Sequence, residues 1–191
     1  MPCIYKVCID PGHGGSDPGA CGNGLRECDV ALAVALKTRD YLVAAGCQVV
    51  MTREKDVDVA YRNASATAEL QARCDVSDRS DADLFLSVHC NSFGNSAALG
   101  TETFCYAGSK LGRGFASCLQ KQLLGVLGTV NRGVKTSPLY VTGHTAALVE
   151  LAFISNRDDA AKLASPVMQD EIARALARGV TDYYYYNGGL K

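Results

Sequence analysis

Residues 7–15 read Val-Cys-Ile-Asp-Pro-Gly-His-Gly-Gly, and the rest of the chain is organised around this stretch. A short apolar run ends in a proline and glycine turn with His13 at its tip. Such a run predicts a buried strand, and open α/β sheets bind ligands at the carboxyl ends of their strands. The glycines permit positive φ and leave space around the imidazole. We therefore expect His13 to lie at a functional site.

Apolar periodicity along the chain alternates between strand and helix patterns. Strands are predicted over residues 3–9, 48–52, 83–90, 101–106, 139–142 and 147–153. Helices are predicted over residues 27–45, 109–127, 157–164 and 167–186, with 57–80 as one long or two short polar helices and 10–26 as a loop. This alternation is typical of βαβ units. We expect an α/β fold, a three-layer α/β/α sandwich whose mostly parallel, twisted sheet of about six strands is flanked by helices.

Length and charge narrow the function classes. The chain has 191 residues, 48% of them hydrophobic, and a formal net charge of -1, which suits a single domain over 1–191. The balanced charge argues against nucleic-acid binding, and no apolar run is long enough for a membrane span. The first residues run directly into the first predicted strand and leave no room for a signal peptide. The chain is therefore expected to be made without one, or to be an excised domain.

Cysteine is unusually frequent, with nine residues, an odd number, and no C-x-x-C motif. The positions are Cys3, Cys8, Cys21, Cys28, Cys47, Cys74, Cys90, Cys105 and Cys118. Several lie in apolar strand or helix patterns, where a free thiol behaves as a small hydrophobic side chain. Because the chain exceeds the size that needs disulfide bonds for stability, buried free thiols are favoured over a disulfide framework.

Three segments each offer one good metal ligand beside a predicted strand or helix end. His13 follows the first strand, Glu27 opens the first helix, and His89 closes the apolar run 83–90. Each has an ordinary alternative: a hydrogen-bonded loop histidine, a carboxylate at a helix N-terminus, and a core histidine. The chain contains only three histidines, so the coincidence favours a site. Two imidazoles and one carboxylate with an open position indicate one catalytic Zn²⁺.

A fourth residue, Glu150, interrupts the apolar segment 148–153. Burying an unpaired carboxylate is costly. One explanation is an ion pair with an arginine elsewhere in the chain, for example Arg157. The explanation we favour is a general base beside the metal, with a pKa raised by the apolar surroundings.

Together these residues resemble the zinc-dependent N-acetylmuramoyl-L-alanine amidases, which cut bacterial peptidoglycan, and the resemblance spans nearly the full chain. The matching segments are Ile-Asp-Pro-Gly-His-Gly-Gly-Ser-Asp-Pro-Gly-Ala (9–20), Glu27, Val-Met-Thr-Arg (50–53), Asp-Leu-Phe-Leu-Ser-Val-His-Cys-Asn-Ser (83–92), Gly-Thr-Glu-Thr (100–103), Arg-Gly-Val-Lys (132–135) and Leu-Val-Glu-Leu-Ala-Phe-Ile-Ser-Asn (148–156). In that family the residues matching His13, Glu27 and His89 bind zinc, and the residue matching Glu150 is catalytic.

The resemblance implies hydrolysis of the amide bond between the lactyl group of N-acetylmuramic acid and the L-alanine of the stem peptide. Zinc would activate water and share the charge of the oxyanion, and Glu150 would carry the proton to the leaving amine. Cys90 stands where the family usually has a small residue, and strand alternation directs it away from His89. Asn91 and His144 are candidate substrate-binding residues, with a solvated loop histidine as the alternative for His144.

Other readings of the same residues stay open. A zinc carboxypeptidase-like peptidase could use a similar ligand set, and a cell-wall binding module could hold zinc without turnover. A nucleotide-binding module is disfavoured, since neither G-x-G-x-x-G nor G-K-[ST] occurs. The expected partner is peptidoglycan, and we expect the chain to act as a monomer at the bacterial cell wall. The chain would arrive there by release at lysis, as phage lysins do, or as an excised secreted domain, and we expect no separate wall-binding domain within it.

Overall fold

A computed structural model describes residues 5–139 and 145–186. The strands are β1 (Lys6–Pro11), β2 (Cys21–Gly22), β3 (Leu25–Arg26), β4 (Gln48–Met51), β5 (Leu84–Asn91), β6 (Thr101–Tyr106), β7 (Asn131–Ser137) and β8 (Thr145–Phe153). The helices are α1 (Glu27–Ala44), α2 (Ala66–Ser80), α3 (Lys110–Leu127), α4 (Arg157–Ala164) and α5 (Pro166–Tyr186). None of these helices is long and apolar enough to cross a membrane.

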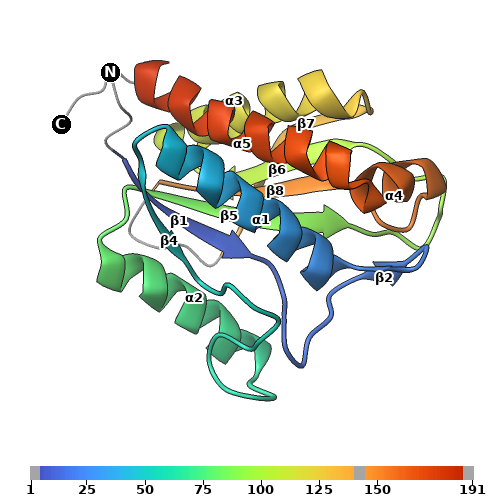
Figure 1. The fold of residues 1–191 in the computed structure, drawn as a ribbon, viewed down its shortest axis with the longest axis horizontal. Helices are drawn as coiled ribbons and strands as arrows, with labels where there is room; N and C mark the ends of the chain where they lie inside the picture. The colour runs from blue at the N-terminus through green and yellow to red at the C-terminus, as the bar shows by residue number, and fades with distance from the viewer. Residues whose placement is uncertain (1–4, 140–144, 187–191) are drawn as a thin grey trace.

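Six strands form one sheet in the order β4-β1-β5-β8-β6-β7. All neighbours are parallel except β6 and β8, so β6 and β7 run against the other four strands. Helices α1, α3 and α5 cover one face, and α2 lies on the other (Figure 1). The predicted three-layer α/β/α sandwich with a mostly parallel sheet is therefore confirmed.

Strand β5 lies near the centre of the sheet, between β1 and β8, and six of its eight residues are buried. Leu86, Val88 and Cys90 belong to the main hydrophobic core, which also contains residues of α1, α3 and α5. Side chains alternate along a strand, so Ser87 and His89 face the α2 side. Cys90 accordingly points away from His89, as the sequence predicted.

Two segments differ from the sequence prediction, and local hydrogen bonds explain the first. The predicted helix 57–80 begins only at Ala66, where the Ser65 side chain caps it by accepting from the backbone N–H of Ala68. The Glu69 carboxylate accepts the backbone N–H groups of Val59 and Ala60 and so holds the preceding segment as a loop. The second segment is β7, which has no apolar alternation because it is an edge strand.

A short hairpin also lies inside the predicted loop 10–26. Strands β2 and β3 pair across Asn23 and Gly24, which both have positive φ, and Asn-Gly is the strongest short hairpin signal. Of the predicted strand 139–142, Leu139 is not in a strand, and the remaining residues lie outside the described ranges.

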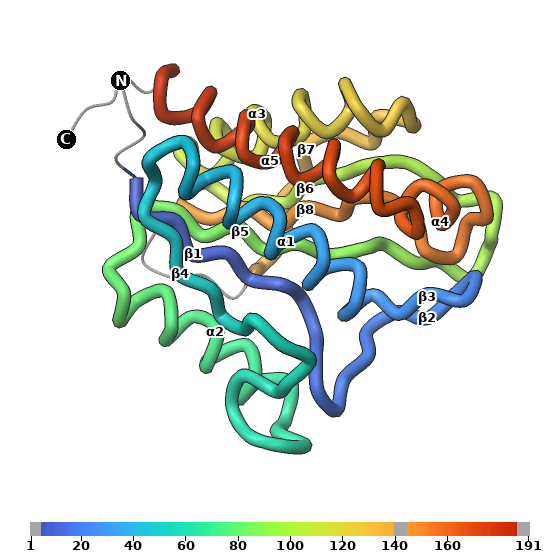
Figure 2. The backbone as a smooth tube through the Cα atoms, in the orientation of Figure 1, coloured from blue at the N-terminus to red at the C-terminus, as the bar shows by residue number. Residues whose placement is uncertain are grey.

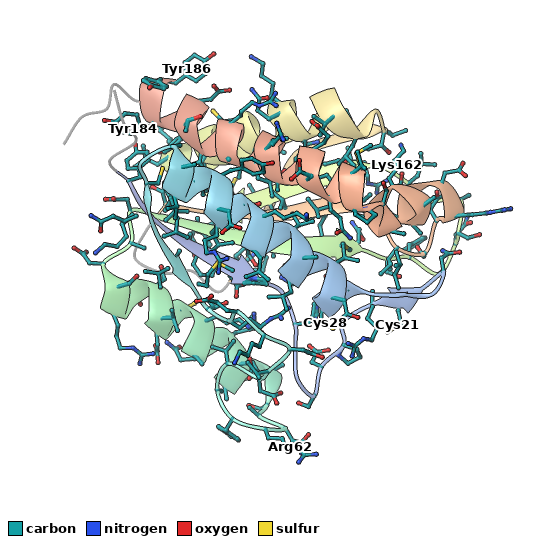
Figure 3. The ribbon with its side chains drawn as sticks, in the orientation of Figure 1. Cys21, Cys28, Arg62, Lys162, Tyr184 and Tyr186 are labelled. Atoms are coloured by element: carbon teal, nitrogen blue, oxygen red, sulfur yellow. The ribbon has the colours of Figure 1, made fainter. Side chains whose placement is uncertain are left out.

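Most of the described cysteines are free, as predicted: Cys8, Cys21, Cys28, Cys74, Cys90, Cys105 and Cys118. Cys47 is disulfide-bonded, which corrects the prediction of a free thiol there. Figure 3 labels exposed Cys21 on the hairpin and buried Cys28 in the first turn of α1. Burial raises the pKa of the Cys90 thiol well above its ordinary value, which disfavours the thiolate that a nucleophile requires.

Candidate active site

The three predicted metal ligands meet at one point. His13 follows β1, Glu27 is the first residue of α1, and His89 lies near the carboxyl end of β5. One side-chain atom from each lies within 4.8 Å of the others. The Oε1 atom of Glu27 is 3.2 Å from Nε2 of His13 and 2.9 Å from Nδ1 of His89. This group could hold a metal ion.

The charges of the group are strongly coupled. Burial lowers the pKa of His13, but the carboxylates of Glu27 and Asp17 outweigh it and raise the pKa to about 9. Burial raises the pKa of Glu27, but His13 and His89 outweigh it and hold the pKa below its ordinary value. The carboxylate therefore attracts positive charge to this point, and a bound cation would displace the proton of His13.

Hydrogen bonds fix the orientation of the ligands. Nδ1 of His13 lies 2.7 Å from Oδ2 of Asp17, which leaves Nε2 directed at the group. Oε1 of Glu27 accepts the backbone N–H of Cys90 at 3.0 Å, and Oε2 accepts that of Ala20 at 2.9 Å. Such outer contacts are typical of metal sites, because they set the tautomer and the direction of each ligand.

Two glycines make room for these side chains. A Cβ atom at Gly12 would collide with the imidazole of His89. At Gly19, where φ is +66°, it would lie 2.6 Å from Cδ2 of His13 and 2.7 Å from Oε2 of Glu27. The glycine-rich loop after β1 therefore serves close packing around the ligands as well as the positive φ it was expected to supply.

Two buried arginines, which the sequence analysis did not single out as functional, hold the backbone that carries His13. Arg53 donates from Nε to the carbonyl of Pro11 at 3.0 Å and from Nη2 to the carbonyl of Gly12 at 2.8 Å. Arg73 donates from Nη1 to the carbonyl of Pro11 at 2.9 Å and from Nη2 to the carbonyl of His13 at 2.8 Å. These contacts support the positive φ of 58° at His13, which is costly for a residue other than glycine.

Asp10 is the charge partner of Arg73, at 2.7 Å from Oδ1 to Nη1. Its carboxylate also accepts the hydroxyl groups of Thr52 and Ser87, each at 2.7 Å. Burial raises the pKa of Asp10, but these partners outweigh it and lower the pKa below its ordinary value. The signal for this network was in the sequence, since Asp10 is a carboxylate at the end of an apolar strand.

The predicted general base, Glu150, lies next to the ligand group. Its Cα pairs with His89 on β5 and with Glu102 on β6. Its Oε2 is buried and has no hydrogen-bond partner, and no ion pair joins it to Arg157 within the described ranges. Burial raises the pKa of Glu150 to about 7; the carboxylates of Glu27 and Glu102 add to this, and His89 opposes it. The alternative of a structural ion pair with Arg157 is thereby wrong.

The two candidate substrate-binding residues have different outcomes. Asn91 donates from Nδ2 to Oε1 of Glu102 at 2.7 Å. Its side-chain oxygen accepts the backbone N–H of Ser92 at 2.8 Å, so both ends of the amide are engaged. His144 lies outside the described residues.

A cavity of about 500 Å³ opens beside the histidines. It lies between α2 and the adjoining face of β5 and β8, and its lining includes His13, His89, Ser87, Leu70 and Leu148. Figure 2 shows the loop after β1 descending beside the segment that precedes α2, and the backbone N–H of Gly15 donates to Asp56 there at 2.8 Å. A substrate can therefore reach the ligand group from the α2 side of the sheet.

Comparison with known proteins places this geometry in a family. N-acetylmuramoyl-L-alanine amidase LytC of Bacillus subtilis (strain 168) is 39% identical over 184 residues, which cover 93% of this chain but only 35% of LytC. The germination-specific N-acetylmuramoyl-L-alanine amidase of the same organism is 32% identical over 198 residues, covering 98% of this chain and 84% of the relative.

A solved structure shows the same fold. The catalytic domain of CwlV, an N-acetylmuramoyl-L-alanine amidase from Bacillus (Paenibacillus) polymyxa var. colistinus, aligns with a TM-score of 0.85 at 31% identity and covers 95% of this chain and 99% of that one. The profile of the Amidase_3 family, described as N-acetylmuramoyl-L-alanine amidase, matches residues 7–182. Since that match takes in both histidines and both glutamates of the candidate site, the chain belongs to the N-acetylmuramoyl-L-alanine amidase family.

Proposed function

We propose that this chain is a zinc-dependent hydrolase that acts at the bacterial cell wall. It cleaves the amide bond between the lactyl group of N-acetylmuramic acid and the L-alanine of the peptidoglycan stem peptide. Family membership supports the substrate class. The observation that carries the reaction type is the buried Oε2 of Glu150. It has no hydrogen-bond partner in the described part of the chain and lies beside the group of His13, Glu27 and His89.

The residues present fit a zinc ion. Two imidazoles and one carboxylate are a zinc donor set that leaves one position open. Gly12 and Gly19 leave the space that the ligand side chains need. Zinc bound there supplies Lewis acidity, which lowers the pKa of water and polarises a carbonyl oxygen.

Glu150 moves the proton in this reaction. Its carboxylate accepts a proton from the attacking water as the water oxygen bonds to the lactyl carbonyl carbon. The carbon–nitrogen bond then breaks, and Glu150 donates the proton to the nitrogen of the leaving L-alanine, which restores the carboxylate. Burial raises the pKa of Glu150 to about 7 in the metal-free protein, and a general base works best when its pKa lies near the working pH.

The binding of peptidoglycan is supported by the cavity beside His13 and His89, which opens onto the face that α2 only partly covers (Figure 1). The proposed ligands and base all come from one chain, so we expect activity from a monomer. Both routes to the wall, release at lysis and secretion as part of a longer protein, stay predictions.

The test uses purified cell walls and the purified protein. We expect about one zinc per chain by metal analysis and loss of wall turbidity that a chelator stops and added zinc restores. New L-alanine amino groups and free muramic lactyl groups should appear in equal amounts. Release of a single amino acid from the end of the stem would indicate a carboxypeptidase, and sedimentation with walls without new amino groups would indicate a binding module. Either result would contradict the proposal.

One substitution tests the role of the base. Glu150→Gln should keep the zinc and lower kcat by roughly 10²- to 10⁴-fold, the usual contribution of a general base. Glu171→Gln, on α5 across the sheet from the site, is the matched control and should keep full activity. If Glu150→Gln retains activity, the assignment of the base is wrong.

A further inference from the structure

Strand β7 carries a bulge beside the site. Thr101 pairs with Asn131, but the next residue, Glu102, pairs with Gly133, so Arg132 is an extra residue in the ladder. The side chain of Asn131 accepts the backbone N–H of Gly133 at 2.9 Å and stabilises this local conformation. Bulges redirect side chains and are frequent next to active sites.

The bulge brings two cations to one carboxylate oxygen. In a regular strand, Arg132 and Lys135 are three residues apart and would lie on opposite faces. Here Nε of Arg132 lies 2.7 Å from Oε2 of Glu102, and Nζ of Lys135 contacts the same oxygen. Burial raises the pKa of Glu102, but Lys135 and Arg132 outweigh it and hold the pKa below its ordinary value.

Arg132 and Lys135 carry more positive charge and more N–H donors than Glu102 uses. Glu102 supplies one negative charge against two positive charges, and its Oε1 is already used by Asn91. Beyond Glu102, the side chain of Arg132 has one further hydrogen bond within the described ranges, at 3.4 Å to the carbonyl of Leu99, and the side chain of Lys135 has no other. The side chains of Arg132 and Lys135 are 35% and 40% exposed. One net positive charge and several N–H donors are therefore available to a ligand.

The cluster is also preorganised and open. The guanidinium of Arg132 lies over the ring of Phe153, 4.9 Å from its centroid, which fixes the plane of its donors. Gly133 has no side chain, and no atom of the described residues lies within 4 Å of the position that its Cβ would occupy. A planar guanidinium with free donors matches a carboxylate in geometry and charge.

The distance between the cluster and the proposed base, Glu150, limits where on the substrate a bound carboxylate can lie. Glu102 and Glu150 are register partners on antiparallel strands, so their Cα atoms are about 5 Å apart. A peptide chain advances about 3.5 Å per residue. A carboxylate that lies within about two residues of the scissile amide, on the leaving peptide, can therefore reach the cluster while the amide lies at Glu150.

We propose that Arg132 and Lys135 form a carboxylate-binding subsite that selects stem peptides with a free carboxylate within about two residues of the scissile amide. The subsite rests on the proposed amidase function. Because the contact is remote from the reacting bond, it stabilises the bound substrate and the transition state equally. It therefore lowers KM and leaves kcat unchanged.

The test compares two synthetic muramyl peptides that are identical except for the second stem residue, which carries an α-carboxylate in one and an α-carboxamide in the other. The unaltered protein should show a kcat/KM about tenfold or more higher for the carboxylate, as expected for a hydrogen bond between charged groups. Arg132→Gln and Lys135→Gln should each reduce this ratio, and the double variant should bring it near one, mainly through KM. Lys162→Gln, on α4, should leave the ratio unchanged.

The ratio of the two kcat/KM values is measured on one preparation of each variant, so it does not depend on the fraction of folded protein. This holds even if a variant is destabilised because Glu102 loses its partners. Equal hydrolysis of both substrates by the unaltered protein would overturn the subsite and leave the amidase function standing. A preference that survives in the double variant would also overturn it. Failure to cleave either substrate would instead count against the amidase function itself.

Discussion

Replacing Arg73 with methionine should destabilise the protein by about 3 kcal/mol. Arg73 projects from α2, and its side chain is only 8% exposed. The substitution keeps the apolar stem of the side chain and removes the guanidinium that binds Asp10 and the backbone carbonyls of Pro11 and His13. The expected loss comes mainly from a buried carboxylate that no longer has its counter-ion.

The magnitude follows from the contacts of Asp10. Breaking a buried ion pair by removing one partner costs about 3–5 kcal/mol. Asp10 keeps the hydroxyl groups of Thr52 and Ser87 in the variant, which places the loss near the lower end of that range. This is a large share of the roughly 5–15 kcal/mol by which domains are stable.

The assay is urea unfolding of the metal-free protein at pH 7, followed by circular dichroism. Arg79→Met is the matched control, because Arg79 lies on the same helix, its side chain is 71% exposed, and it pairs with Asp75 only at 4.0 Å. That control should change stability by less than about 0.5 kcal/mol. A loss below about 1 kcal/mol for Arg73→Met would refute the reasoning, since the buried charge would then not depend on its arginine.

Acid provides an internal check on the same residue pair. The pKa of Asp10 is lower in the folded protein than its ordinary value of 3.8. Its contribution to stability is therefore complete above about pH 4 and is lost as the pH falls through the folded pKa. The difference in stability between the unaltered protein and Arg73→Met should narrow in that acidic range. A gap that stays constant down to pH 2 would show that the pair is not its source.

Three further predictions concern the ligand group and the proposed base beside it. Asp17→Asn should weaken zinc binding about 10- to 100-fold in a chelator competition, because His13 loses the carboxylate that orients its imidazole. An unchanged affinity for zinc would contradict this role of Asp17. Gly19→Ala should abolish zinc binding and activity. Gly24→Ala should retain both, because Gly24 also has a positive φ but no described atom lies within 4 Å of its Cβ position. Equal losses in the two variants would indicate that backbone strain alone is responsible. In the same urea assay of the metal-free protein, Glu150→Gln should gain more stability over the unaltered protein at pH 8 than at pH 5. Burial raises the folded pKa of Glu150 from its ordinary value of 4.5 to about 7, so the unaltered protein loses stability as the pH rises from about 4.5 to about 7. A stability difference that does not change with pH would contradict this.

Residues 57–65 and β7 show where sequence reasoning failed. The polar pattern over 57–80 fits a helix throughout, but Ser65 and Glu69 supply local hydrogen bonds that begin the helix at Ala66. The strand β7 has no alternation to detect, because an edge strand with polar side chains buries little apolar surface. The start of α2 thus depends on particular hydrogen bonds, and β7 depends on pairing with β6. The periodicity of apolar residues shows neither.

The sequence by itself determined the central strands and the candidate ligands. The apolar runs of β1 and β5 are each followed or ended by a polar residue, His13 or His89, and parallel strands bring their carboxyl ends to one edge of the sheet. Glu27 needed only its place at the start of α1. These assignments depend on local pattern and on a general rule of sheet topology, so they could be made without coordinates.

Only the tertiary structure decided how each buried charge is compensated. Asp10 meets Arg73 and Glu102 meets Arg132 across 63 and 30 residues of sequence. Oε2 of Glu150, in contrast, has no hydrogen-bond partner among the described residues, and the pKa of Glu150 stays raised. The apolar segment around Glu150 already predicted its raised pKa, but the local sequence does not show which arginine meets Asp10 or Glu102. The pKa values of these carboxylates differ because the fold places different side chains beside them. Burial strengthens each of these interactions, since water screens buried charges less.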